Sequence, residues 1–478
     1  MIFSTVTFLF YFLPLFLLIY FVLPFRNTTL LIASLIFYAW GEPENLGLLV
    51  ISILLNYGFG LAIGKAKSQG RCGKPELILG IIVNLGGLTY FKYFNFLMAG
   101  IKSIFVSANV ALPEFEVVAL PLGISFLTFH AISYLVDVYR EKTKCEKNVF
   151  ALSTYMTMFP QLVAGPIIRF STVARQLHHR HHTWNRIDIG LQIFIVGLAQ
   201  KVLIANIVAL PADKIFSVAA TDLSFVVAWL GIVCYSLQIY FDFFGYSNMA
   251  IGLGLMLGFT FPRNFNLPYV ARSLTEFWQR WHLSLSRWFR DYLYIPLGGN
   301  RVAPWRTYLN LFVVFFLCGL WHGASWTFVF WGVFHGFFLI VERAGLGELL
   351  KKAPNFLRHC YTLIVVMIAW VFFRADSFSQ AADFLYAMFG LNHFQIAAAP
   401  VGSFLNGVTT TALIIGVLLA LPAKNIAANV FRAYRRSVWV RMHFLFGTVR
   451  RACLLGIFVL SAISLASGAY NPFIYFRF

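Results

Sequence analysis

The chain has 478 residues, of which 60% are hydrophobic and 12% are charged, and its mean hydropathy is +0.76. A soluble domain carries about twice that charged fraction. Aromatic residues reach 18% of the chain and include 53 Phe. A water-soluble fold could not cover so much apolar surface, so the composition excludes a soluble domain and predicts an integral membrane protein.

The formal net charge of +19 raises the question of a nucleic-acid partner. Most of the basic residues, however, stand in loops between apolar runs, which is where membrane topology places them. We therefore expect no nucleic acid, and we expect anionic lipid headgroups and an anionic cytoplasmic substrate instead. The six Cys are far apart and form no CxxC pair, so they predict small apolar side chains and no disulfide framework.

Twelve apolar segments predict an all-α, polytopic fold with about 12 transmembrane helices. The segments are 4–24, 28–40, 46–63, 77–98, 117–139, 187–211, 224–244, 307–321, 326–342, 361–373, 404–421 and 452–470. Two more apolar stretches, 149–168 and 247–262, carry Gly and Pro and are predicted to be re-entrant segments buried in protein. The first segment lacks a basic region and a cleavage site, so we expect a retained helix. With no long linker, the chain reads as a single membrane domain over 1–478.

The basic residues test this map. Seven loops carry 31 of the 37 Lys and Arg, and the alternation of twelve spans places all seven loops on one face. These loops are 25–27, 64–76, 140–148, 169–186, 263–306, 343–360 and 422–451. Only Lys102, Lys214, Arg374 and Arg477 fall on the opposite face. The basic face is predicted to be cytoplasmic, with both termini extracytoplasmic.

One segment, 269–306, departs from the hydropathy pattern. Its apolar residues recur at helical spacing, namely Phe277, Trp281, Leu285, Trp288 and Tyr292, while its arginines lie largely on other faces. That pattern predicts an interfacial amphipathic helix with aromatic side chains at headgroup depth. Two interpretations stay open: a membrane-surface anchor, or a basic helix that shapes the mouth of a cavity for an anionic substrate.

Ionisable residues inside a membrane are costly, so each is a candidate site residue. The strongest is His322 in GLWHGASW, next to Gly319 and Gly323, where the backbone can be approached closely. A buried neutral imidazole is a good general base near neutral pH, although a His hydrogen-bonded at a hairpin tip fits the pattern equally well. His282 lies forty residues earlier on the amphipathic segment, where a headgroup-facing or capping role is the plainer interpretation.

Other polar residues in apolar surroundings favour structural roles. His335 and His130 are expected to be satisfied core histidines. Asp242 needs a cationic partner, for which an arginine of 263–306 is expected, while Lys201 lies deep in a span and either pairs or snorkels. The cluster His178, His179, His181 and His182 has no Cys or carboxylate at close spacing, so we expect no metal site there. No GxSxG, Walker A, HExxH or GxGxxG site appears.

Several stretches resemble the membrane-bound O-acyltransferase (MBOAT) superfamily. They are IASLIFYAWGEP, YFKYFNF, LPLGISFLTFHAISYLVDVYR, FPQLVAGPIIRF, QIYFDFFGYSNMAIGLGLMLGF, LTEFWQRWHLSLSRWFRDYLYIPLGGNR, LCGLWHGASWTFVFWGVFHG and the terminal NPFIYFRF. Within the superfamily the chain looks like the bacterial branch that contains the alginate O-acetyltransferase membrane subunit. Phe244 and Asn248 depart from that branch, which tends to carry Ser and Asp at these positions.

The resemblance implies a ring-like helical core with a central tunnel, in which His322 is the catalytic residue and His282 a second catalytic position. It implies acetyl transfer from a cytoplasmic thioester such as acetyl-CoA to an alginate-like, extracytoplasmic polysaccharide, directly or through a periplasmic partner of the SGNH type. His322 would act as base, and His282 would orient the thioester or stabilise the oxyanion. We expect no bound cofactor, no metal, and a bacterial inner-membrane location. The expected substrate-binding residues are Arg280, Trp281, Arg287, Arg290, Asp291, Trp321, Asp242 and Tyr240.

Two alternatives come from other classes. A transporter or flippase for an acyl group or a lipid-linked glycan would use Lys201, Asp242 and the re-entrant segments, although no inverted repeat is visible. A non-catalytic scaffold of a polysaccharide export complex is the third interpretation. Substrate uptake into vesicles without any thioester would favour the transporter, and substitution of His322 would separate the enzyme from the scaffold.

Overall fold

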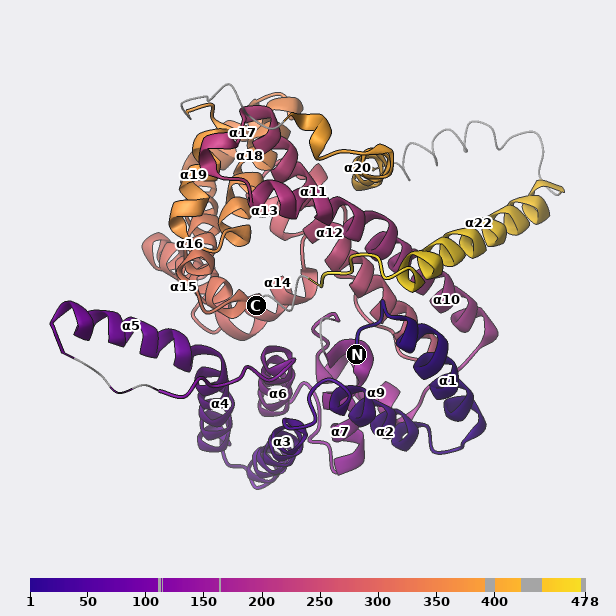
Figure 1. The fold of residues 1–478 in the computed structure, drawn as a ribbon. Helices are drawn as coiled ribbons and strands as arrows, with labels where there is room; N and C mark the ends of the chain where they lie inside the picture. The colour runs from indigo at the N-terminus through magenta and orange to yellow at the C-terminus, as the bar shows by residue number, and fades with distance from the viewer. Residues whose placement is uncertain (111–112, 114, 163–164, 392–399, 423–440, 474–478) are drawn as a thin grey trace. The chain divides into compact units, whose positions relative to one another are not determined.

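The computed structural model describes residues 1–478 except 111–112, 114, 163–164, 392–399, 423–440 and 474–478. Across the described residues the regular elements are helices and no strand occurs, which confirms the all-α prediction (Figure 1). Arg477 and most of the predicted basic loop 422–451 lie outside the described residues.

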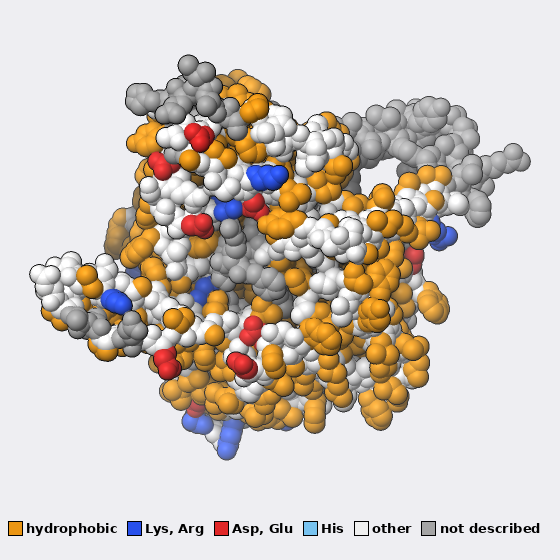
Figure 2. All heavy atoms as spheres, viewed as in Figure 1, with side chains coloured by type: hydrophobic (Ala, Val, Ile, Leu, Met, Phe, Trp, Pro, Cys, Tyr) orange, Lys and Arg blue, Asp and Glu red, His pale blue; other side chains and the backbone are white. Residues whose placement is uncertain are grey.

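Seven helical stretches of the described chain are long and apolar enough to cross a membrane. They are Leu46–Ser68, Lys74–Ser107, Trp184–Phe216, Phe225–Met256, Trp326–Lys352, Asn355–Arg374 and Gly447–Ala466. Three shorter apolar helices are Phe8–Val22, Ile124–Tyr139 and Gly407–Ala420. Each of the twelve predicted segments contains a helix, and hydrophobic side chains cover much of the face seen in Figure 2. The protein is therefore a multi-pass membrane protein.

The chain folds into two compact units, and neither is one continuous stretch of sequence. The first comprises Met1–Gly190 and Leu253–Pro262, and the second comprises Leu191–Gly252 and Arg263–Phe478. The single membrane domain expected over 1–478 stays a prediction.

The first unit contains the N-terminal helices. They are η1 (Phe8–Phe12), α1 (Leu13–Val22), α2 (Arg26–Ala39), α3 (Leu46–Ser68), α4 (Lys74–Leu88), η2 (Thr89–Tyr93), α5 (Phe94–Ser107), α6 (Ile124–Tyr139), α7 (Val149–Thr157), α8 (Phe159–Leu162) and α9 (Phe170–His178). Helices α3, α4 and α6 pack against one another (Figure 1). Asn56 and Asn84 exchange hydrogen bonds of 3.1 and 2.8 Å between α3 and α4, which joins two apolar helices through a satisfied polar pair.

The second unit contains the later helices, with α10 (Trp184–Ala199) and α12 (Phe225–Met256) running across its border. The others are η3 (Gln200–Ala205), α11 (Asn206–Phe216), η4 (Ala220–Asp222), η5 (Pro268–Val270), α13 (Leu274–Trp278), α14 (Leu283–Phe289), η6 (Arg290–Tyr294), α15 (Pro304–His322), α16 (Trp326–Val341), η7 (Glu342–Leu346), α17 (Gly347–Lys352), α18 (Asn355–Arg374), α19 (Phe378–Met388), η8 (Val401–Ser403), α20 (Gly407–Ala420) and α22 (Arg441–Ala466).

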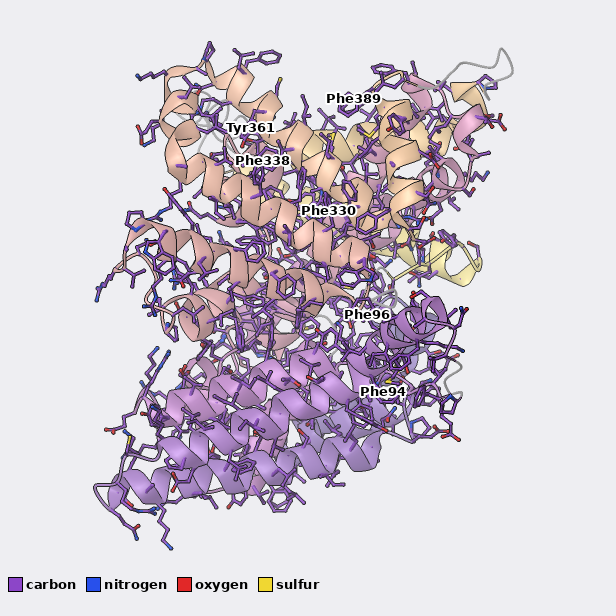
Figure 3. The ribbon with its side chains drawn as sticks, turned by 90° about the vertical axis from the view of Figure 1, so that its left-hand side faces the viewer. Phe94, Phe96, Phe330, Phe338, Tyr361 and Phe389 are labelled. Carbon is purple, nitrogen blue, oxygen red and sulfur yellow. The ribbon has the colours of Figure 1, made fainter. Side chains whose placement is uncertain are left out.

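Helices α15 and α16 pack closely in the second unit, because glycines let their backbones meet. A Cβ on Gly319 would lie 2.4 Å from the Phe328 carbonyl oxygen, and one on Gly332 would lie 2.3 Å from that of Phe315. Aromatic rings join α16 to α18: Phe338 faces Tyr361 with ring centroids 6.3 Å apart (Figure 3). This packing fixes the end of α15, where His322 stands.

Two predicted segments differ in the structure. Residues 247–256 continue α12 as one helix to Met256, so the predicted re-entrant segment 247–262 is wrong over its first ten residues. Gly254 allows close packing there, because a Cβ on it would lie 2.6 Å from the Phe261 ring. In the predicted span 117–139 the helix begins only at Ile124. The stretch 149–168 does form two short buried helices, α7 and α8.

Candidate active site

His322 is the last residue of α15, and it is buried, with 6% of its surface exposed. Its imidazole lies edge-on to three aromatic rings, with ring centroids 4.9 Å from Trp321, 4.9 Å from Trp331 and 5.3 Å from Phe373. The extended backbone of Gly323 ends the helix directly after it. The predicted catalytic histidine is therefore held by rings from α15, α16 and α18.

His282 lies between α13 and α14, fully buried, in the left-handed backbone region with φ of 42°. Its Nδ1 is 3.1 Å from Oδ1 of the buried Asn264. That oxygen also accepts hydrogen bonds from the Ser284 backbone N–H at 3.1 Å and from the Ser284 hydroxyl at 2.9 Å. A backbone N–H can only donate, which fixes the orientation of the Asn264 amide.

The same contacts fix the tautomer of His282. Because Asn264 Oδ1 is an acceptor, the His282 proton must sit on Nδ1, so Nε2 carries the lone pair. Nε2 has no hydrogen-bond partner among the described residues. Burial lowers the pKa of His282 to about 3, so the ring is neutral at pH 7. Neutral His282 therefore offers an acceptor at Nε2 and cannot donate there.

The two histidines share a neighbour. The Trp321 ring lies 6.1 Å from the His282 ring and 4.9 Å from the His322 ring, measured between centroids. Phe243 of α12 also lies edge-on to the His282 ring, with centroids 4.5 Å apart. The structure thus brings together three of the predicted residues: His282, Trp321 and His322.

The predicted amphipathic helix is wrong as a single interfacial helix. Residues 274–289 form two short helices separated at 279–282, and the aromatic residues of the segment are buried in protein. Trp281 is 3% exposed and its ring lies 5.0 Å from that of Trp370. The aromatic residues do recur at helical spacing in the sequence. The left-handed backbone at His282 nevertheless turns the chain, and the aromatic side chains pack inward.

The arginines of this segment are partly neutralised. Arg280 forms an ion pair with Glu276 at 2.8 Å, and Arg290 forms one with Asp291 at 2.6 Å. Arg287 is exposed. A role for these side chains in binding an anionic substrate stays a prediction.

The partner of Asp242 is Lys201 rather than an arginine of 263–306. Their charged atoms lie 2.7 Å apart, and both side chains are 1% exposed. Lys201 also donates to Asn206 at 2.7 Å and to the Pro472 carbonyl oxygen. Hydropathy could not predict this pair, because it joins η3, α12 and the end of the chain; the contacts favour an architectural role.

Tyr240 is fully buried, and its ring lies 6.2 Å from that of Trp281. Its hydroxyl has no hydrogen-bond partner among the described residues. His335 and His130 are also fully buried, as expected of structural residues: the Trp278 N–H donates to His335 Nδ1 at 3.3 Å, and the Ile168 N–H donates to His130 Nε2 at 3.3 Å.

Two residues that the sequence did not single out position the site. Asn264 orients His282, as described above. Glu342 is 6% exposed and accepts hydrogen bonds from the backbone N–H groups of Leu274 and Thr275, at 2.6 and 3.0 Å, where α13 begins. Neither has a signal in the sequence, because each lies 18 or more residues from its partner.

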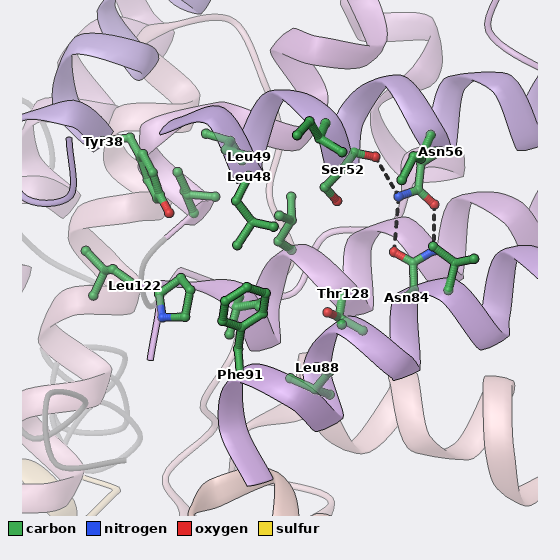
Figure 4. Close-up of a pocket in the computed structure, with 18 residues that line it drawn as sticks. Tyr38, Leu48, Leu49, Ser52, Asn56, Asn84, Leu88, Phe91, Leu122 and Thr128 are labelled. Carbon is green, nitrogen blue, oxygen red and sulfur yellow. Dashed lines mark hydrogen bonds between the residues drawn. The ribbon is translucent and has the colours of Figure 1, made fainter. Parts of the chain in front are cut away.

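A cavity of about 160 Å³ lies in the first unit among α3, α4 and α6 (Figure 4). Most of its lining is apolar, as at Leu48, Leu88 and Phe91, and none of the predicted site residues lines it. In the described residues no group of three His, Cys, Asp or Glu side chains could hold a metal ion.

The protein is a multi-pass helical protein in which two buried histidines contact the ring of one tryptophan, Trp321. These features fit the class of membrane acyltransferases. The sequence profile of the membrane-bound O-acyltransferase family matches residues 146–379. The chain belongs to this family, and it is an acyltransferase. This membership favours the enzyme over the flippase and the scaffold.

Several relatives of known name are similar to this chain over most or all of its length. The chain is 40% identical to the probable alginate O-acetylase AlgI of Azotobacter vinelandii, over the whole of both chains. It is 44% identical to the protein of that name in Pseudomonas aeruginosa, over 88% of this chain and 79% of the other. It is 38% identical to the peptidoglycan O-acetyltransferase of Helicobacter pylori, over 88% of this chain and 86% of the other.

Proposed function

We propose that the protein moves an acetyl group from a cytoplasmic thioester, such as acetyl-CoA, to a hydroxyl of an extracytoplasmic polysaccharide. The names of the relatives support this proposal, because an alginate O-acetylase and a peptidoglycan O-acetyltransferase both place acetyl groups on a polysaccharide. The basic loops support an anionic, phosphorylated donor on the cytoplasmic face. More specifically, we propose that the acceptor is an alginate-like polysaccharide, which receives the acetyl group directly or through an SGNH-type periplasmic partner.

His322 is the proton acceptor in this proposal. The acceptor hydroxyl gives its proton to the imidazole while its oxygen attacks the thioester carbonyl carbon. The tetrahedral intermediate then collapses, the carbon–sulfur bond breaks, and the leaving thiolate takes the proton back from the imidazolium. The observation that carries the assignment is a buried imidazole at a helix end that Gly319 and Gly332 fix against α16.

The tautomer of His282 changes the part that the resemblance suggests for it. A neutral ring with its lone pair on Nε2 cannot donate to an oxyanion. It can accept a hydrogen bond, and a sugar ring offers a second hydroxyl beside the reacting one. We propose that His282 Nε2 holds that neighbouring hydroxyl and so aims the first one at His322.

The oxyanion then needs another donor. The indole N–H of Trp331 is buried, has no hydrogen-bond partner among the described residues, and belongs to a ring 4.9 Å from that of His322. A preorganised N–H in a site without water is the type of group that stabilises a developing oxyanion. Trp331 is the donor we propose.

The test is transfer of labelled acetyl from acetyl-CoA in membranes that contain the protein and its polysaccharide. We expect His322→Ala to lower the rate by about 10²–10⁴-fold, the usual contribution of a positioned base. His179→Ala is the matched control, because His179 is exposed and lies outside the site. Full activity of His322→Ala at normal expression would refute the assignment.

A further inference from the structure

A cluster of basic side chains in the first unit has no part in the chemistry proposed above. Arg26 begins α2, Arg180 and His182 lie between α9 and α10, and Arg186 lies in the first turn of α10. All four belong to loops that the sequence assigns to the basic face of the protein. They come from segments more than 150 residues apart in the chain, so the fold assembles them.

Hydrogen bonds hold these segments in place. Asn27 donates to the Leu177 carbonyl oxygen at 2.8 Å. The Thr260 N–H donates to Gln176 Oε1 at 2.8 Å, and Arg186 donates to the Thr260 hydroxyl at 2.8 Å. The basic side chains therefore stand on two segments, which hydrogen bonds tie to each other and to a third segment around Thr260.

His182 is the centre of the cluster. Its Nδ1 accepts a hydrogen bond from Arg26 at 3.1 Å, and its Nε2 lies 3.1 Å from the Leu257 carbonyl oxygen, to which Tyr20 also donates at 3.0 Å. Burial, and then the charges of Arg26 and the other two arginines, lower the pKa of His182 to about 4. The ring is neutral at pH 7 and serves to position Arg26.

Among the residues that the structure describes, no carboxylate pairs with the positive charge of the cluster. Arg26 contacts His182, Arg186 contacts Thr260, and Arg180 lies over the Phe259 ring at 4.4 Å. One nitrogen of Arg180, Nη1, is buried and has no hydrogen-bond partner among the described residues. None of the three arginines forms an ion pair with a carboxylate of the described residues. Three guanidinium groups around one imidazole repel one another unless an anion joins them.

Apolar side chains flank this charge. The Phe21 ring lies 5.8 Å from the His182 ring and is 38% exposed. Val22, Phe25 and Trp184 are 71%, 70% and 87% exposed. A free phosphate would gain nothing from such neighbours, whereas a phospholipid carries a phosphate and acyl chains together.

We infer that Arg26, Arg180 and Arg186 form a phosphate-binding site that holds the headgroup of an anionic phospholipid. The guanidinium groups bind the phosphate, which is the geometry that arginine favours. The acyl chains lie along the exposed apolar side chains of the neighbouring helix ends. This lipid joins the segments around His182 and adds to the stability of the folded protein.

The experiment is a titration of the purified full-length protein in detergent with phosphatidylglycerol, followed by thermal unfolding. We expect a saturable rise in Tm for the natural protein, and none with phosphatidylcholine. In R26Q/R180Q/R186Q the apparent affinity should fall on the order of 100-fold, since each basic residue near an anionic lipid contributes about 5-fold. K142Q/K144Q/K147Q, which removes the same charge from an exposed loop of the same face, should keep the natural affinity.

Three results would overturn the inference. They are an unchanged response in the arginine variant, an equal loss in the lysine variant, or an equal Tm rise with inorganic phosphate alone. Because the triple variant could misfold, the single variant R180Q is measured as well, with monodisperse elution as the test of folding. It should bind about 5-fold more weakly, and natural affinity in a folded R180Q would also overturn the inference.

Discussion

At the scale of single residues, the environment of each histidine decides its chemistry. His282 and His322 are both buried and both contact Trp321. His322 could be proposed from the sequence because ionisable residues inside a membrane are rare. His282 could be proposed as catalytic only because the motif around it resembles a family. Asn264 could not be proposed, because its contact with His282 spans 18 residues that include η5 and α13. Yet Asn264 decides which nitrogen of His282 carries the proton.

Substitution of Asn264 tests that role. Asn264→Asp keeps the shape and the acceptor, and its negative charge should raise the pKa of His282 from about 3. The lone pair on Nε2 is lost when the ring is protonated, so acetyl transfer should now fall at a higher pH. The measurement is kcat/KM against pH, in which the acid limb should move upward. Asn266→Asp, at an exposed position two residues away, should leave the profile unchanged. Identical profiles for both variants would contradict the positioning role.

At the scale of elements, hydropathy predicted where helices lie better than how they end. All twelve predicted segments contain helix, but α12 runs to Met256 and the segment around His282 is broken. A glycine-rich apolar run is compatible with a break or with close packing, and only tertiary contacts decide between them. Likewise, aromatic residues at helical spacing predict a stripe but do not say whether lipid or protein covers it.

Substitution of Gly332 tests whether the close packing of α15 against α16 matters for stability and activity. Gly332→Ala would place a Cβ 2.3 Å from the Phe315 carbonyl oxygen, so the helices must separate and the end of α15 must move. We expect a loss of about 1–3 kcal/mol in stability, as in other overpacked sites, together with reduced acetyl transfer. Thermal unfolding in detergent measures the first. Gly87→Ala in α4, where nothing lies within 4 Å, is the control. Equal behaviour of the two variants would show that the close approach is unimportant.

At the scale of the whole molecule, composition alone predicted the class correctly. A chain with 60% hydrophobic residues forms many apolar helices, and the described residues contain seven long ones. The pairs that join distant parts of the chain were beyond sequence reasoning. Lys201 and Asp242, for example, are 2.7 Å apart although each was assigned to a different segment. Hydropathy and periodicity are local measures, and such pairs depend on tertiary structure.

The orientation in the membrane is a prediction at this scale. The basic loops place exposed Cys72 in the cytoplasm and exposed Lys102 outside. In spheroplasts, a membrane-impermeant maleimide should therefore label a cysteine introduced as Lys102→Cys and should not label Cys72 until the membrane is opened. Exposed Cys453 is replaced by Ser beforehand. Labelling of Cys72 in closed spheroplasts would reverse the assigned orientation.

The central claim is that a thioester on the basic face supplies acetyl to a hydroxyl on the opposite face through His322. Inside-out vesicles, from cells that make the polysaccharide, test it directly when labelled acetyl-CoA is added outside. We predict that label accumulates on polysaccharide in the lumen with the natural protein, and does not with His322→Ala. Lumenal label that is unaffected by His322→Ala, or label found only on polysaccharide outside the vesicles, would contradict the account.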